Sequence, residues 1–590
     1  MKSLINCLEA KVQLVFEACG YKKEYGVLTY SNRPELCQFQ CNGALAAAKA
    51  YRKIPFEIGK EVITLLEQEN CFKQVECVMP GFINLSVSDE YLVDYLTTQS
   101  KTPQWGCEKP GEGHTLIIDY GGPNVAKPLH VGHLRTAIIG ESIKRIGRFL
   151  GYKVLGDVHL GDWGLQIGLI ITELKQRYPS LIYFDPDYKG PCPEEAPFNM
   201  NELEEIYPKA SSCAKSNPWF MEEAKQATYL FQNGHPAYVA LWKHILEVSI
   251  ADLKKNYENL NVYFDLWKKE SDAQPYISQM IKDLKEKGFA YESEGALVVD
   301  VKEESDTKEI PPCIIVKSNG ATLYSTTDLA TIVERMDLYA PDEIIYIVDK
   351  RQGMHFEQVF RCAKKTGLVP ATTKLTFIGF GTMNGKDGKP FKTREGGVMR
   401  LEHLIQSVSQ QVYEKVSTNK EMDEAEAWSI SKKVGIAALK YGDLSNQIAK
   451  DYVFDLERFT SFEGNTGPYI LYTVVRIKSI LNKFQVLYPQ VKIDDLKFQV
   501  PKTKSESALM LILAQFSDML LNSFKEYAPH RICQYVYELS NTFNKFYHEN
   551  KILSEEDELT QKSWIKLIDM TQNLLVACLD LLGIEAPDKM

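Results

Sequence analysis

The chain has 590 residues, of which 44% are hydrophobic and 25% charged, as expected for a folded globular protein of roughly three or four domains. Its 68 Lys and Arg and 78 Asp and Glu give a formal net charge of −10, which argues against a protein that coats nucleic acid non-specifically. Glu9 and Lys11 interrupt the first apolar run, and no stretch of about 20 apolar residues follows, so no signal peptide or membrane contact is predicted. We expect a cytoplasmic protein.

Residues 1–108 are predicted to form a small α+β domain. Leu4, Leu8, Val12 and Val15 have helical spacing, and residues 78–85 resemble a strand entered through a Pro-Gly turn. Turn-forming residues between 102 and 113 mark the end of this domain.

Residues 109–400 have the pattern of a doubly wound, Rossmann-type α/β domain. Short apolar runs alternate with helical segments, as in a parallel sheet covered by helices. We expect helical insertions at about 175–315, where the pattern is mostly helical. The expected strands cover residues 115–120, 153–155, 343–348 and 375–378.

Residues 401–590 show helical spacing only, which predicts an all-α bundle. The expected helices cover residues 401–416, 425–441, 468–484, 507–527, 532–549 and 561–582.

The thirteen cysteines include no CxxC pair. Cys37 and Cys41 are four residues apart and Cys71 and Cys77 six apart, but neither pair has a matching partner downstream. We therefore expect reduced thiols, no zinc and no protein metal site.

The segment His130-Val131-Gly132-His133 follows the first expected strand of the α/β domain and a Gly-Gly-Pro turn. A strand, loop and helix in this order direct backbone N–H groups at a phosphate. Gly132 allows a flat base to approach the backbone, and both imidazoles can donate hydrogen bonds to phosphate oxygens. The motif alone is better explained by two surface histidines.

A longer series of motifs resembles the arginyl-tRNA synthetase family of class I aminoacyl-tRNA synthetases. The segment PNVAKPLHVGHLR (123–135) is similar to the family's form of the class I HIGH signature. The same holds for GDWGLQ (161–166), KYGDL (440–444), FEGNTGPY (462–469) and, near the N-terminus, QCNGA (40–44) and GFIN (81–84). The resemblance thus covers nearly the whole chain.

This resemblance implies an arginine pocket. A guanidinium is planar and presents five donors, so carboxylates and other acceptors must meet it in its plane. Without the resemblance, Asp119 is explained equally well as an exposed acid at a strand end, and Asp328 as a helix N-cap. The positions that match the family's arginine contacts are Asp119, Asn124, Tyr324, Asp328 and Gln352.

The second class I signature, KMSKS, corresponds to residues 386–397. Thr393 stands where the second lysine is expected, which leaves Lys127, Lys392 and Arg394 as the cations available for catalysis. The resemblance assigns ATP to His130, Gly132, His133 and Lys392. A solvated basic loop is the alternative for residues 386–397.

The family resemblance implies an ATP-dependent arginine–tRNA ligase that uses ATP with Mg²⁺ and attaches arginine to the 2′-hydroxyl of the terminal adenosine of its tRNA. The N-terminal domain is expected to touch the tRNA corner and the helical bundle to read the anticodon, and we expect a monomer. The alternatives are another class I aminoacyl-tRNA synthetase and a non-catalytic tRNA-binding paralogue. Candidate RNA contacts, which helical aromatics in a core explain equally well, are Tyr469, Tyr472, Tyr547, His548 and Asn550.

Overall fold

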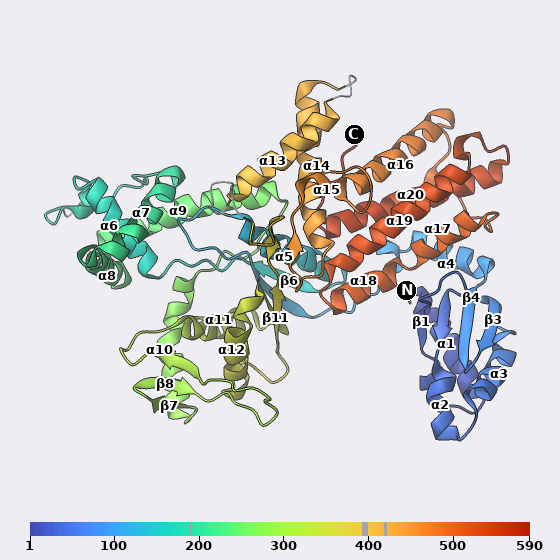
Figure 1. Cartoon of the computed structure of the whole chain (residues 1–590), viewed down its shortest axis with the longest axis horizontal. Coiled ribbons are helices and arrows are strands. Elements are labelled where there is room, and N and C mark those ends of the chain that lie inside the picture. Colours follow the sequence, from blue (N-terminus) through green and yellow to red (C-terminus); the bar gives the residue numbers. More distant parts are fainter. Residues whose placement is uncertain (189, 392–398, 418–421) are drawn as a thin grey trace. The chain divides into compact units, whose positions relative to one another are not determined.

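The computed structural model describes residues 1–188, 190–391, 399–417 and 422–590, whose elements are labelled in Figure 1. The chain divides into two compact units. Unit 1 contains Met1–Pro110, Ser461–Leu581 and Glu585–Met590, and unit 2 contains Gly111–Thr460 and Leu582–Ile584.

The N-terminal part of unit 1 is an antiparallel sheet of order β1-β2-β4-β3 with helices packed against it. The residues predicted to face the core of its first helix, Leu4, Leu8, Val12 and Val15, are all buried. Its elements are α1 (Leu4–Ala18), β1 (Leu28–Tyr30), β2 (Phe39–Cys41), α2 (Gly43–Tyr51), α3 (Pro55–Leu66), β3 (Phe72–Val78), β4 (Phe82–Val87) and α4 (Asp89–Lys101).

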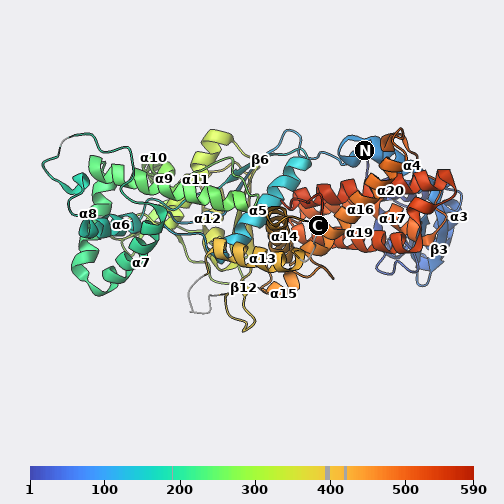
Figure 2. The ribbon, with the colours of Figure 1, turned by 90° about the horizontal axis from the view of Figure 1, so that it is seen from above.

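The C-terminal part of unit 1 is helical, and α16, α19 and α20 lie side by side (Figure 2). No single helix among the described residues meets the length and hydropathy of a membrane span, although the bent pair α17 and α18 does so by composition alone. The helices are α16 (Gly467–Leu487), α17 (Lys504–Ala514), α18 (Phe516–Lys525), α19 (Pro529–Glu549) and α20 (Glu558–Leu581).

Unit 2 is built on a parallel sheet of order β11-β10-β5-β6, so the chain reverses its winding between β5 and β10. Helix α5 packs on β5, β6 and β10, and α12 packs on β11. The four strands coincide with the predicted ones. The bounds are β5 (Thr115–Tyr120), α5 (Val131–Phe149), β6 (Lys153–Asp157), α11 (Tyr324–Tyr339), β10 (Glu343–Asp349), α12 (Gly353–Lys365) and β11 (Lys374–Phe380).

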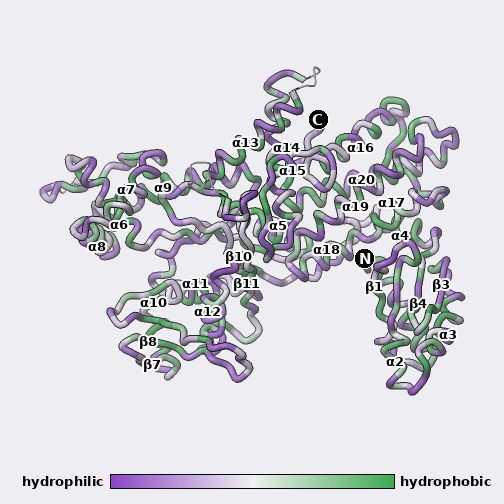
Figure 3. The backbone as a smooth tube through the Cα atoms, in the orientation of Figure 1, coloured by the Kyte–Doolittle hydropathy of each residue, from purple (hydrophilic) through white to green (hydrophobic). Residues whose placement is uncertain are grey.

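The insert between β6 and α11 is helical in its first part only. In α7, hydrophobic and hydrophilic residues alternate along the helix, and Leu203, Ile206 and Ala210 are buried (Figure 3). The end of the insert forms an antiparallel sheet, β7-β8-β9, which the expected helical insertion did not include. The elements are α6 (Leu165–Arg177), α7 (Met200–Ser216), α8 (Pro218–Gln232), α9 (Pro236–Asn259), α10 (Glu270–Glu286), β7 (Ala290–Ser293), β8 (Ala296–Val299) and β9 (Cys313–Val316).

The compact unit that holds the parallel sheet ends at Thr460 and not at residue 400, where the sequence suggested a boundary. Helices α13 and α14 pack on α5, which explains why residues 401–460 belong to unit 2. The remaining elements of this unit are β12 (Met383–Asn384), α13 (Leu401–Val416), α14 (Glu424–Leu444), β13 (Tyr452–Val453) and α15 (Leu456–Phe459).

Candidate active site

Polar side chains gather where the parallel strands end, at the edge where ligands bind in open α/β sheets. Asp119 near the end of β5 is the register partner of Asp157 in β6 and of Tyr346 in β10. The three residues therefore form a row across adjacent strands, next to the reversal of strand order between β5 and β10. Asp119 is the member that the sequence predicted.

Arg335 of α11 completes this row. Its Nη2 donates to Oδ2 of Asp119 at 2.6 Å and to Oδ2 of Asp157 at 2.7 Å, and its guanidinium lies 5.3 Å from the centroid of the Tyr346 ring. Asp119 is therefore not a free strand-end acid, because an arginine of the chain itself already contacts one of its oxygens.

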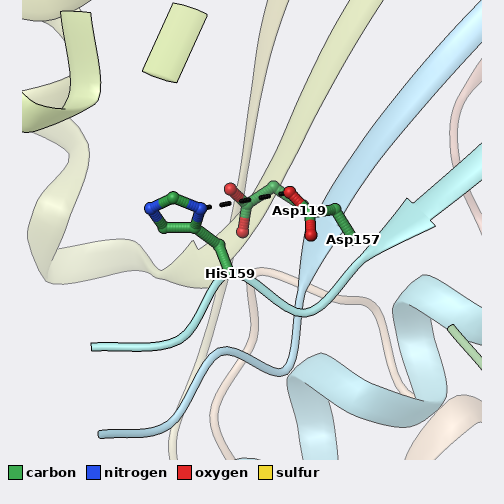
Figure 4. Close-up of side chains that lie close together, drawn as sticks. All are labelled: Asp119, Asp157 and His159. Carbon is green, nitrogen blue, oxygen red and sulfur yellow. Dashed lines mark ion pairs between the residues drawn. The ribbon is translucent and has the colours of Figure 1, made fainter. Parts of the chain in front are cut away.

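Figure 4 shows Asp119, Asp157 and His159 close together. They form the only group of His, Cys, Asp and Glu side chains in the described parts of the chain whose ligand atoms come close enough for a shared metal ion. The Nη2 atom of Arg335 sits between the two carboxylates, and His159 Nδ1 lies 4.0 Å from Asp157. A guanidinium thus occupies the place that a metal ion would take.

Tyr324 and Asp328 both lie on α11, one helical turn apart, as their spacing predicted. Leu323 is the N-cap of this helix, which excludes the alternative that Asp328 is the cap. Tyr324 is 76% exposed, and Oδ2 of Asp328 lies 2.6 Å from Nε2 of His355 in α12. Burial raises the pKa of Tyr346 most, and the negative charges of Asp119 and Asp328 raise it further. Both carboxylates therefore act on the same side chain of the site.

Asn124 lies in the loop that follows β5, and Gln352 ends the short 3₁₀ helix η4 (Lys350–Gln352) that follows β10. Asn124 is exposed and bridges to Gly161, where any side chain would collide with Oδ1 of Asn124. Gln352 is exposed at the N-cap of α12. All five residues predicted to contact arginine therefore belong to the segments that end β5, end β10 or begin α11.

His130 and His133 lie at the N-terminus of α5. His130 is the N-cap, and its Nδ1 accepts from the Gly132 N–H at 3.0 Å, while Nδ1 of His133 accepts from the His130 N–H at 3.2 Å. Because Nδ1 accepts in both rings, the proton of each neutral imidazole sits on Nε2. A Cβ at position 132 would lie 2.8 Å from Cε1 of His130, so Gly132 also makes room for this ring.

Both histidines are held neutral. Burial, followed by the charge of Lys127, lowers the pKa of His130; burial, His130 and Lys127 lower the pKa of His133 to about 3. Each ring therefore offers a neutral Nε2–H donor beside the positive end of the helix dipole, an arrangement suited to a phosphate.

Lys127 lies in the loop before α5, with its Nζ 4.5 Å from the centroid of the Tyr207 ring. Of the expected cationic loop, Lys386 lies 3.5 Å from Asp455. The predicted catalytic residues Lys392 and Arg394, together with Thr393, lie outside the described residues.

In unit 1, three of the predicted RNA contacts come together between α16 and α19. Arg476 stacks over Tyr472 at 4.8 Å and over Tyr547 at 5.6 Å, and its Nη1 donates to Oδ1 of Asn544 at 2.7 Å. Tyr469 accepts from Asn544 at 2.9 Å. Tyr472 is 42% exposed, so the cluster is not simply core.

Asn550 does not fit the expected RNA contact. It is buried, and its Nδ2 donates to the Phe546 carbonyl at 2.8 Å and to Ser505 at 3.4 Å. Its amide therefore caps the last turn of α19 and is buried, so it does not face a ligand. The neighbouring His548 is exposed.

Sequence reasoning missed Asp157, Arg335, His355, Arg476 and Asn544. Two of them carried a usable signal: Asp157 follows the predicted strand 153–155 by two residues, and Arg476 is one helical turn after Tyr472. The other three follow from tertiary packing and had no local signal.

Comparisons with known proteins agree with this geometry. The model of class I tRNA synthetases (R), catalytic domain, matches residues 96–456, the DALR anticodon binding domain matches residues 470–590, and the arginyl tRNA synthetase N terminal domain matches residues 2–87. Proteins named arginine–tRNA ligase from Agathobacter rectalis and Alkaliphilus oremlandii are 57% and 58% identical, with 100% of each chain covered.

Solved structures show the same fold. The arginyl-tRNA synthetase of Plasmodium falciparum superposes with a TM-score of 0.82 at 25% identity, and that of Thermus thermophilus with 0.79 at 21%, each with 100% of both chains covered. The chain therefore belongs to the arginyl-tRNA synthetase family of class I aminoacyl-tRNA synthetases.

Proposed function

We propose that this chain is an arginine–tRNA ligase, which activates arginine with ATP to arginyl-adenylate and transfers it to the 2′-hydroxyl of the terminal adenosine of its tRNA. The observation that carries the proposal is the full-length similarity to arginine–tRNA ligases. Two carboxylates of the site support it, because Asp119 near the end of β5 and Asp328 on α11 offer acceptors to a substrate with two cationic groups.

The first step is attack by the arginine carboxylate on the ATP α-phosphate. The nucleophile is already an anion, so alignment and charge stabilisation are needed and a general base is not. The Nε2–H groups of His130 and His133 donate to phosphate oxygens at the N-terminus of α5. Lys127 neutralises charge on the departing pyrophosphate, together with the Mg²⁺ that enters with ATP.

Discrimination against other amino acids follows from the same pocket. An uncharged side chain leaves the partly buried carboxylates of Asp119 and Asp328 without a cationic partner from the substrate, which costs more than the loss of one ordinary hydrogen bond. We therefore expect arginine to be selected in the first step, without a proofreading site.

We assign the tRNA anticodon to the face formed by Tyr469, Tyr472, Arg476 and Tyr547, because bases of single-stranded RNA stack on aromatic and guanidinium planes. We further propose that the chain acts in the cytoplasm as a monomer. The thirteen cysteines are all unbridged, as expected in a reducing compartment.

Aminoacylation of total tRNA with ATP, Mg²⁺ and arginine tests the proposal. Charging of tRNA with another amino acid would favour a different class I synthetase. Binding of tRNA without charging would favour a non-catalytic paralogue.

A further inference from the structure

Arg335 is a charged side chain inside the site to which no step of the proposed reaction assigns a role. It is 1% exposed and lies on α11, three residues after the buried Ile332 and on the same side of the helix, which faces the sheet. Its Nη2 bridges one oxygen of Asp119 and one of Asp157. Its Nε and Nη1 have no hydrogen-bond acceptor of ordinary geometry among the described residues.

Stability alone does not account for such a cluster. Removing three charged groups from water costs several kcal/mol per ion, and well-packed apolar side chains of similar volume are often as stable. Two guanidinium nitrogens without acceptors add to the cost. A role in the site is therefore the better explanation for an arginine at this position.

The two carboxylates differ in what they can reach. The Asp157 side chain is fully buried, and its other oxygen, Oδ1, accepts from the Lys268 N–H at 3.2 Å. The Asp119 side chain is 13% exposed, and no partner of its Oδ1 is found in the part of the chain that the structure describes. Arg335 thus fixes Asp119 through Oδ2 and leaves Oδ1 for a ligand.

Charge balance indicates which ligand Oδ1 meets. Asp119, Asp157 and Asp328 contribute three carboxylates and Arg335 one guanidinium, so the carboxylates outnumber the guanidinium by two. Free arginine has two cationic groups, its guanidinium and its ammonium. Without Arg335, the carboxylates of Asp119 and Asp157 would lie side by side with little solvent between them. Such a pair takes up a proton, because two adjacent negative charges repel each other.

We infer that Arg335 is a positioning residue for arginine binding: its guanidinium lies between the carboxylates of Asp119 and Asp157, offsets their repulsion and turns Oδ1 of Asp119 toward a cationic group of the substrate. This inference rests on the proposed function. The titratable side chains that face Asp119 are Asp157, His159 and Tyr346, with Asp328 on α11. Burial raises the pKa of Asp157, which makes this pair ready to share a proton once the guanidinium is removed.

The test measures KM for arginine and for ATP between about pH 6 and pH 9 in five proteins: the wild type, Arg335→Met, Asp157→Asn, Arg335→Lys and the double variant Arg335→Met/Asp157→Asn. In Arg335→Met we expect KM for arginine to rise about 10- to 100-fold at neutral pH and to fall again as the pH increases, since the adjacent carboxylates then lose the proton that they share. KM for ATP should change less than about threefold. Arg335→Lys should restore part of the arginine affinity.

The double variant separates the effect of the second carboxylate from the loss of the guanidinium. The Asp157→Asn substitution retains an acceptor for the Lys268 N–H and removes the carboxylate that repels Asp119 when the guanidinium is absent. We expect the double variant to bind arginine at least about fivefold better than Arg335→Met, a coupling that a double-mutant cycle reports. Additive losses in the double variant, or equal losses for arginine and ATP in Arg335→Met, would overturn the inference.

Arg135→Met is the matched control, because Arg135 is 2% exposed and its Nε lies 3.1 Å from Oδ2 of Asp443, away from Asp119. It should lower the melting temperature without changing the pH dependence of KM for arginine. Wild-type charging with arginine separates the two hypotheses: its absence refutes the proposed function, whereas its presence with a pH-independent Arg335→Met refutes only the role of Arg335.

Discussion

Asp328→Asn tests the pocket most simply, because asparagine has the same shape and lacks the negative charge. The Asp328 side chain is 24% exposed and its Oδ2 lies 2.6 Å from His355. A hydrogen bond to a charged group contributes about 1.5–3 kcal/mol. Because solvent screens the interaction of the partly exposed Asp328 with the substrate, we expect its contribution to lie near the lower end of this range, at about 1.5–2 kcal/mol.

This free energy corresponds to a rise of about 10- to 30-fold in KM for arginine. Initial rates of aminoacylation at varied arginine and at varied ATP measure it, and KM for ATP should stay within about twofold. Asp337→Asn is the control on the same helix, because Asp337 is exposed and contacts Tyr276. An unchanged KM for arginine in Asp328→Asn, with the protein folded, would refute the reasoning.

Three further predictions concern ATP and RNA. Lys127→Ala should lower kcat more than about tenfold and change KM for arginine less than about threefold, because Lys127 stabilises the charge that develops on the phosphates. Equal effects on kcat and on KM for arginine would show that Lys127 does not have this role. Because burial lowers the pKa values of His130 and His133, protonation of either ring should not limit kcat/KM for ATP near the usual histidine pKa of about 6.5, and the pH profiles of the wild type and His130→Gln should have the same shape there. Arg476→Ala should raise KM for tRNA about tenfold without changing KM for ATP, since stacking on a base contributes about 1–3 kcal/mol. Arg531 is exposed, and Arg531→Ala should leave KM for tRNA unchanged.

The strands and helices of this chain were largely predictable from periodicity. The four strands of the parallel sheet and helix α13 lie where the sequence placed them, because each buried strand is a short apolar run between turn residues. Residues 507–527 are a different case: the expected single helix is α17 and α18, with a break at Gln515 that the apolar pattern does not reveal. The β7-β8-β9 sheet was missed because its strands of four residues are too short to show a period.

The candidate site was predictable only where a motif named its residues. His130, Gly132 and His133 follow from the strand–loop–helix unit and are placed at the helix N-terminus as expected. Arg335 and His355 were not predictable, because their partners Asp119 and Asp328 lie 216 and 27 residues away in the chain. Asn550 was assigned to RNA from its neighbours Tyr547 and His548, but the last turn of α19 directs its side chain inward.

We propose that Asp119 near the end of β5 and Asp328 on α11 select arginine for attachment to tRNA. Aminoacylation of total tRNA, measured with each of the standard amino acids in turn under ATP and Mg²⁺, tests it most directly. We expect charging with arginine and with no other amino acid. Charging with lysine or with an uncharged amino acid at a comparable rate would contradict the account.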